Sequence, residues 1–261
     1  MTNFGNKDWL IEVNQGNVPG YAIVHKFGKN PAVGTGAIED IWYAGGLYAW
    51  PTTASTLEAI STSGNDTNAA GTGARVVTVQ GLTIAGAEIS EDINMAGLVA
   101  SAATSASFFR VNRAYVKTSG TYATGVTGSH AGTITIRVSG AGATQATIPL
   151  EGALPLGQTQ MARYSVPASK KAFLLTTSVA VSSKQNALVY FQVREDAATV
   201  AAPFAPRRVR LAPPTFSGVI GQMHHGAGPY TGIADMWWSS ISDAGGAADV
   251  SINFEILLID I

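Results

Sequence analysis

Cysteine is absent from this chain of 261 residues, so neither disulfides nor thiolate-bound metals stabilise its fold. A cysteine nucleophile is excluded for the same reason. Charge is also scarce: Asp, Glu, Lys and Arg make up 13% of the sequence, against a usual share of roughly 25%. Hydrophobic residues make up 46%, which is enough for a large core. A surface with so little charge is typical of a subunit that its neighbours partly cover or of a stable extracellular shell, and we favour the assembly.

Signals for a membrane or a nucleic acid are missing as well. The 16 basic and 17 acidic residues nearly balance, which leaves no broad basic surface for DNA or RNA. The first residues lack the basic segment and apolar run of a secretory signal. No segment approaches the roughly 20 apolar residues that a membrane-spanning helix needs. We therefore expect neither a membrane nor a nucleic acid as a main partner.

Motifs of the common enzyme classes are absent from the sequence. It has no Gly-x-Ser-x-Gly elbow that would place a serine on a strained turn, and no Gly-Lys-Ser/Thr phosphate loop. Gly71-Thr72-Gly73 lacks the spacing and the βαβ setting of a dinucleotide loop. We predict a protein that is not an enzyme, with no catalytic residues and no cofactor.

Two groups of residues are candidates for a metal site, and neither has the required pattern. His224 and His225 are adjacent, so on a strand their side chains point to opposite faces and seldom reach one ion. Glu88, Glu91 and Asp92 form an acidic cluster without the dense oxygen ligands that calcium needs. We predict no metal site and interpret both groups as ordinary polar residues.

Alternating hydrophobic residues dominate the pattern that is present. Residues 133–139 place Ile134, Ile136 and Val138 on one face, and residues 250–258 alternate in the same way. About ten to twelve such strands, separated by turns, are typical of sandwiches and barrels. No amphipathic helix of ten or more residues is apparent. The sequence predicts an all-β protein, an antiparallel β-sandwich of jelly-roll type.

The N-terminal part is expected to be separate from this sandwich. Residues 9–13 and 21–24 read as two short strands around a turn at 17–20. Residues 1–38 are therefore either an edge hairpin on the main sheet or an extended arm that reaches a neighbouring subunit. Residues 39–261 form the sandwich, and a further division of it near residue 150 stays open.

One stretch also carries a family resemblance. GNDTNAAGTGARVVTVQGL, at residues 64–82, is followed by the acidic strand Glu88–Ile93 and by Phe109–Val116. Together with Tyr164–Ala168 and the C-terminal strand, it resembles structural proteins of tailed bacteriophages, especially those of aquatic bacteria. The resemblance covers most of the chain from about Trp9 onward. It implies a virion protein, assembled in the host cytoplasm, with the major capsid protein or other virion proteins as partners.

Within a virion we expect capsid decoration or cementing by a homo-oligomer, with a trimer as the preferred arrangement. Aromatic residues and arginine are enriched in interface cores. Arg207, Arg208 and Arg210, with prolines on both sides, form either a docking segment or a charged edge that discourages stray pairing. Trp237 and Trp238 are adjacent, so their rings are expected on opposite faces of a strand. One ring would lie in the core and the other at an interface or a sugar-binding surface, and we favour a subunit contact. The candidate interface residues are Trp9, Trp42, Trp50, Arg207, Arg208, Arg210, Trp237 and Trp238.

Three alternatives stay open at this point. The first is a tail, fibre or adaptor component that contacts the host. The second is a carbohydrate-binding β module that stacks sugars on Trp42, Trp50, Trp237 or Trp238. The third is a polysaccharide hydrolase, which is disfavoured because no motif places a pair of carboxylates.

Overall fold

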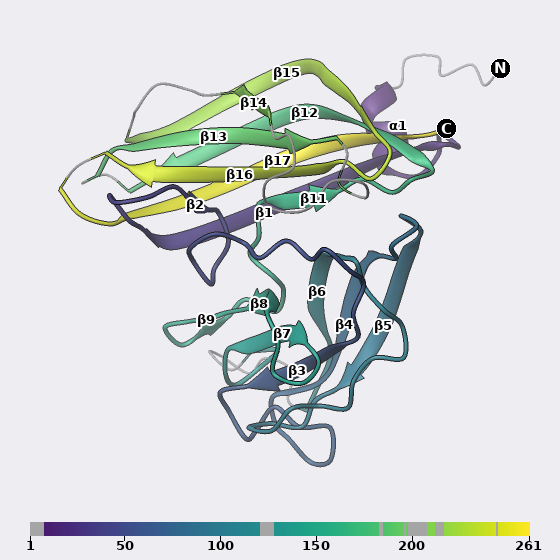
Figure 1. Ribbon diagram of the computed structural model, residues 1–261, viewed down its shortest axis with the longest axis vertical. Coiled ribbons are helices and arrows are strands. Elements are labelled where there is room, and N and C mark those ends of the chain that lie inside the picture. The colour runs from purple at the N-terminus through teal and green to yellow at the C-terminus, as the bar shows by residue number, and fades with distance from the viewer. Residues whose placement is uncertain are drawn as a thin grey trace.

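The chain folds into two lobes of antiparallel sheets (Figure 1). The computed structural model describes residues 8–120, 128–182, 185–195, 197, 208–211, 217–243 and 245–261. Every strand pair among these residues is antiparallel. The prediction of a mainly β protein with antiparallel sheets is therefore confirmed.

The large lobe, at the top of Figure 1, consists of two sheets that share one core. The four-stranded sheet has the order β1 (Tyr21–Val33), β17 (Ala248–Asp260), β12 (Lys170–Val181) and β15 (Gly218–Thr231). The five-stranded sheet has the order β11 (Arg163–Ser165), β16 (Asp235–Ser242), β13 (Ala187–Arg194) and β14 (Arg208–Leu211), and β2 (Glu39–Asp40) also pairs with β16. Side chains from both sheets interdigitate, which is how such layers bury their apolar faces.

The second lobe, which we call the inserted lobe, contains β3 to β10. One sheet has the order β3 (Leu57–Ser61), β7 (Ile134–Val138) and β8 (Thr144–Ile148). The other has the order β5 (Glu88–Asn94), β4 (Ala74–Leu82) and β6 (Arg110–Ser119). A short ribbon joins β9 (Leu150–Glu151) to β10 (Leu154–Pro155).

Alternation along the strands explains the burial. In β17, Val250, Ile252, Phe254, Ile256 and Leu258 all face the core of the large lobe, as the sequence pattern predicts. In β7, Ile134 and Ile136 lie in the core of the inserted lobe, and Val138 packs against it. Each lobe therefore has a hydrophobic core of its own.

The N-terminal segment differs from expectation. Residues Trp9–Asn14 form a short helix, α1, so the strand predicted over residues 9–13 is wrong. Asp8 explains the difference, because its carboxylate accepts hydrogen bonds from the backbone N–H groups of Leu10 and Ile11 and so caps the first turn. Strand β1 then forms an edge of the four-stranded sheet and pairs with the last strand of the chain. No helix in the described ranges is long and apolar enough to cross a membrane.

The inserted lobe lies in the chain between β2 and β11, two strands that share one edge of β16 in the five-stranded sheet. Strands β2 and β11 lie end to end along the same side of β16. Trp238 of β16 lies where the two strands meet. Its carbonyl accepts a hydrogen bond from the N–H of Ile41, and its own N–H donates to the carbonyl of Ala162. The chain leaves the sheet after Ile41 and returns at Ala162, so the large lobe takes strands from both sides of the boundaries expected at residue 38 and near residue 150. Gly28 permits the close approach here, because a Cβ at this position would lie 2.0 Å from the backbone nitrogen of Ala162.

Candidate functional site: the lobe junction

Strand β16 contributes side chains to both cores. Trp238 packs with Phe191 and Phe254 in the large lobe, at ring-centroid distances of 5.0 and 6.4 Å. Trp237 points to the other face and meets Trp50 in the core of the inserted lobe, at 5.3 Å. The prediction that the two neighbouring rings face opposite sides is confirmed. The interface that they span lies between the two lobes of one chain.

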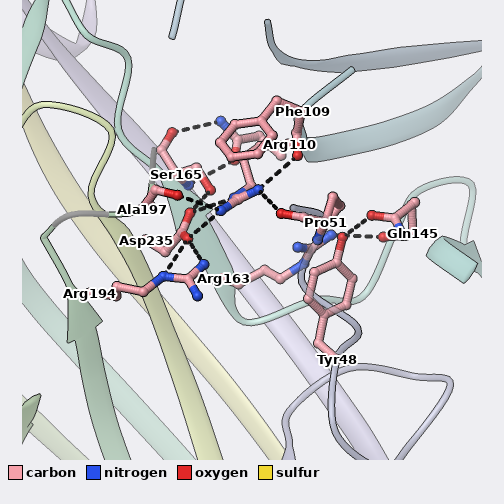
Figure 2. Close-up of polar contacts among 11 residues, drawn as sticks. Tyr48, Pro51, Phe109, Arg110, Gln145, Arg163, Ser165, Arg194, Ala197 and Asp235 are labelled. Atoms are coloured by element: carbon pink, nitrogen blue, oxygen red, sulfur yellow. Dashed lines mark hydrogen bonds and ion pairs between the residues drawn. The ribbon is translucent and has the colours of Figure 1, made fainter. Parts of the chain in front are cut away.

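A buried carboxylate begins the same strand. Asp235 is 0% exposed, and its register places it between Ser165 of β11 and Arg194 of β13. Arg110 comes from β6 in the inserted lobe and makes a two-pronged contact: Nε donates to Oδ1 at 2.9 Å and Nη2 to Oδ2 at 3.0 Å. Arg194 donates to Oδ2 through Nε at 3.2 Å and through Nη2, and the Ser165 hydroxyl donates to Oδ1 at 2.6 Å (Figure 2). One carboxylate thus joins strands of both lobes.

A third arginine extends this cluster. Arg163 is buried, its Nη2 donates to the carbonyl of Gln145 at 2.7 Å, and its guanidinium lies 3.4 Å from the centroid of the Tyr48 ring. Its Nε has no hydrogen-bond partner. The guanidinium groups of Arg110, Arg163 and Arg194 all lie within 5.5 Å of the Trp50 ring, a favourable position for cations. Burial lowers the pKa of Arg163, while Tyr48 and Asp235 oppose that shift.

A second polar connection lies beside the arginines. Asn112 of β6 and Ser165 of β11 form a reciprocal pair: Asn112 Nδ2 donates to the Ser165 carbonyl at 2.9 Å, and the Ser165 N–H donates to Asn112 Oδ1 at 2.8 Å. Lys26 of β1 donates from Nζ to the Asn112 carbonyl at 2.5 Å. Burial, followed by the charges of Arg163 and Arg113, lowers the pKa of Lys26 to about 7.

Two hollows flank Lys26 where the lobes meet. One, of about 340 Å³, is also lined by Glu88, Ser90, Asn112 and Tyr164. The other, of about 420 Å³, runs along residues 23–27 of β1 and is bordered by Gln158 and Thr159. Both include Val24, Lys26 and Arg113, so the two hollows meet at these residues. We call this combined region the junction cleft.

The polar contacts at the junction hold the two lobes together. Both oxygens of Asp235 accept from guanidinium groups, so the carboxylate is not available as a base. Charges this deeply buried are stable only when they are paired and hydrogen-bonded. Within the described part of the chain, no group of three or more His, Asp or Glu side chains is placed to hold a metal. The arrangement therefore positions the lobes relative to each other.

The residues weighed as metal ligands have other partners. His224 Nε2 lies 3.1 Å from the Thr177 hydroxyl, and partial burial lowers the pKa of His224. The side chain of His225 lies outside the described residues. Glu91 accepts from the backbone N–H groups of Ser105 and Ala106, at 2.7 and 2.8 Å. Asp92 accepts from Lys117 at 2.5 Å, which together with the Thr78 hydroxyl lowers the pKa of Asp92.

The structure separates the predicted interface residues into three groups. Four tryptophans lie in the cores with at most 8% of their surface exposed, because their rings pack against other aromatic rings there, and the expectation that they offer contact surface is corrected: Trp42, Trp50, Trp237 and Trp238. Trp9 remains on the surface, 37% exposed, with its ring edge-on to Tyr21 at 5.3 Å. Arg208 and Arg210 lie in β14 at the end of the sheet order, and Arg207 lies outside the described residues.

Sequence reasoning missed the buried charges, although a signal for them exists. Arg110 stands in the run Phe109-Arg110-Val111, and Asp235 directly precedes Met236-Trp237-Trp238. A charged residue within an apolar strand has to find an opposite charge if it faces the core. Such positions mark Arg110 and Asp235 as candidates for a buried pair, but which residues pair depends on the register of strands far apart in the chain.

Comparisons with known proteins identify no family. No protein-family model matches the chain, and no curated protein matches it. Among solved structures, a chain in the structure of infectious bursal disease virus Gx strain aligns with 92% of this chain and 82% of its own length, at 9% identity and a TM-score of 0.13. A score this low establishes no shared fold.

We predict that Asp235→Asn destabilises the protein by about 3–5 kcal/mol, because two buried guanidinium groups lose their counter-charge. Urea unfolding followed by tryptophan fluorescence measures the change. Asp92→Asn is the matched control, since the Asp92–Lys117 pair is exposed and a smaller loss that shrinks in high salt is expected there. Equal losses for the two variants would contradict the role given to Asp235.

The lowered pKa of Lys26 predicts a pH dependence. Between pH 7 and 10.5 the unfolded chain holds a proton on Lys26 that the folded protein has lost, so this group makes stability rise with pH in that window. The expected slope is about 1.4 kcal/mol per pH unit at most. The variant Lys26→Met removes this contribution. If the stability difference between the native protein and Lys26→Met stays constant from pH 7 to 10, the lowered pKa of Lys26 is refuted.

Proposed function

We propose that this protein is a non-enzymatic structural component of a tailed-phage virion that decorates or cements the capsid surface as a homo-oligomer, with a trimer favoured. The assignment to a tailed phage rests on the sequence resemblance. The geometry supports the structural part of the proposal, because the buried polar cluster is used inside the chain. We also propose that the large lobe has a jelly-roll arrangement, which its two facing sheets support.

An apolar surface at the N-terminus is the observation that carries the assembly proposal. Trp9, Leu10, Ile11 and Tyr21 are 37%, 44%, 55% and 37% exposed, and we call these four residues the N-terminal patch. The other side of α1 is already occupied, since Val13 packs on Leu257 of β17. A six-residue helix with apolar residues on both sides is more stable when a second surface covers the outer side.

The burial of the tryptophans separates this proposal from the carbohydrate-binding alternative. Sugar stacking requires an accessible ring face, and the four tryptophans suggested for it are in the cores. The N-terminal patch combines Trp9 and Tyr21 edge-on with two aliphatic side chains, a composition typical of protein contacts.

Location in the particle is tested by electron microscopy of virions that carry a labelled copy of the protein. Label over the capsid surface supports decoration or cementing. Label confined to the tail would overturn the capsid proposal in favour of a tail or adaptor component. A virion without the label would refute the virion proposal as a whole.

We predict that Ile11→Glu dissociates the oligomer. Each buried isoleucine contributes about 1.5–3 kcal/mol, so its loss weakens association at least about tenfold per contact. Size-exclusion chromatography with light scattering measures the mass over a dilution series. Ile84→Glu is the matched control, because Ile84 is 49% exposed on the inserted lobe and does not belong to the patch. A native protein that is monomeric at every concentration would contradict the proposal.

A further inference from the structure

Two cations, Lys26 and Arg113, line the junction cleft without a carboxylate partner among the described residues. Lys26 has the Asn112 carbonyl as its acceptor, at 2.5 Å. Arg113 donates through Nε and Nη2 to the neutral amide oxygen of Gln158, at 3.1 and 2.8 Å. Arg163 does not line the cleft, but it is buried and its charge acts on Lys26, while Asp235 is already shared by two other arginines. Glu88 borders the cleft and forms no ion pair within the described ranges. The cleft therefore has an excess of positive charge.

Lys29 is a second lysine of β1, and its environment can be compared with that of Lys26. Three residues after Lys26, it pairs with Glu151 and lies 3.1 Å from Asp249. These two carboxylates raise the pKa of Lys29, whereas the pKa of Lys26 is lowered. The two lysines differ first in burial, which lowers the pKa of Lys26, and second in that no carboxylate pairs with Lys26 among the described residues.

An open backbone edge runs along the same cleft. In an antiparallel pair, alternate residues direct both N–H and C=O to the same side. Phe27 accepts from Met161 on the side away from β17, and Tyr21 donates on that side to Val18. Because the register of β1 and β17 is regular from Tyr21 to Asn30, Ile23 and His25 direct their N–H and C=O groups to this side as well. There the hollow of about 420 Å³, which is part of the junction cleft, separates β1 from Gln158 and Thr159.

We propose that the junction cleft binds an extended peptide segment of a neighbouring virion protein, which pairs with Ile23 and His25 of β1 and directs a carboxylate side chain to Lys26 and Arg113. Backbone pairing supplies affinity without sequence preference, and the carboxylate supplies selection for acidic segments. Only a short stretch of β1 is available between Tyr21 and Phe27, so three to five residues suffice to occupy it. The proposal depends on the proposed function in one respect, the origin of the segment.

The test uses acetyl-Thr-Val-Glu-Val-Thr-amide as probe and the same peptide with Gln in place of Glu as control. Isothermal titration calorimetry measures affinity, and nuclear magnetic resonance follows the backbone N–H signals of Ile23 and His25. The expected result is at least about tenfold tighter binding of the Glu peptide, with both N–H signals shifted. Equal affinity for the two peptides, or no binding of either, would overturn the proposal.

Matched variants locate the carboxylate. Lys26→Met and Arg113→Gln are each expected to reduce the affinity for the Glu peptide to that of the Gln peptide. Lys29→Met is expected to leave it unchanged, since Lys29 has carboxylate partners of its own. Unchanged binding by Lys26→Met and Arg113→Gln, with folding verified by circular dichroism, would place the peptide elsewhere and refute the cleft.

The pH profile provides a second readout. Arg163 from β11, Arg113 from β6, Glu88 from β5 and Tyr164 from β11 are the charged or titratable groups around Lys26, and His25 lines the cleft. Because binding requires protonated Lys26, affinity for the Glu peptide should fall from pH 6 to 9, and His25→Gln should keep this fall above pH 7. A flat profile would contradict the role of Lys26.

Titration with small anions distinguishes a site for an acidic peptide from a site for a free anion. Acetate and inorganic phosphate are titrated under the same conditions. Weak binding of acetate that leaves the N–H signals of Ile23 and His25 in place agrees with the proposal. If acetate or phosphate binds as tightly as the Glu peptide, the cleft is a small-anion site and the peptide proposal fails. The peptide measurements do not depend on where the protein lies in a particle, so either proposal can fail alone.

Discussion

The contact of Asp235 with Arg110 and Arg194 is the interaction on which the arrangement of the two lobes depends. Its groups are buried, and in a medium of low dielectric a charge that loses its partner is strongly unfavourable. Arg110 belongs to the inserted lobe, whereas Asp235 and Arg194 belong to the large lobe. Any rotation of one lobe against the other would separate them. The pair of lobes therefore behaves as one body, although each has its own hydrophobic core.

Two surfaces proposed as contact sites lie along β1. The N-terminal patch ends at Tyr21, the first residue of the strand, and the junction cleft begins two residues later at Ile23. One surface offers apolar side chains and the other offers backbone groups and cations. In the proposed assembly, this proximity would bring two neighbouring subunits to one strand. A subunit with few charged residues and an exposed apolar helix is suited to such shared contacts.

The alternation of hydrophobic and polar residues along the sequence predicts most of the strands. The alternation in residues 133–139 and 250–258 predicts β7 and β17, because it depends only on which face is buried. The helix at Trp9–Asn14 was missed because the cap at Asp8 outweighs a run of apolar residues that also suits a strand. The site was missed for another reason. Asp235 meets Arg110 across 125 residues of sequence, and such a pairing follows from sheet register, which composition and periodicity do not specify. The same holds for Trp42, Trp50 and Trp237, whose burial depends on the inserted lobe, which no local pattern reveals.

Differential scanning calorimetry tests the central claim most directly, since it reports how many units unfold independently. If buried charges couple the lobes, the protein unfolds in a single transition whose calorimetric enthalpy equals its van't Hoff enthalpy. Two resolved transitions in the native protein, one for each lobe, would contradict the account, because they would show that the contact of Asp235 with Arg110 does not bind the lobes into one cooperative structure.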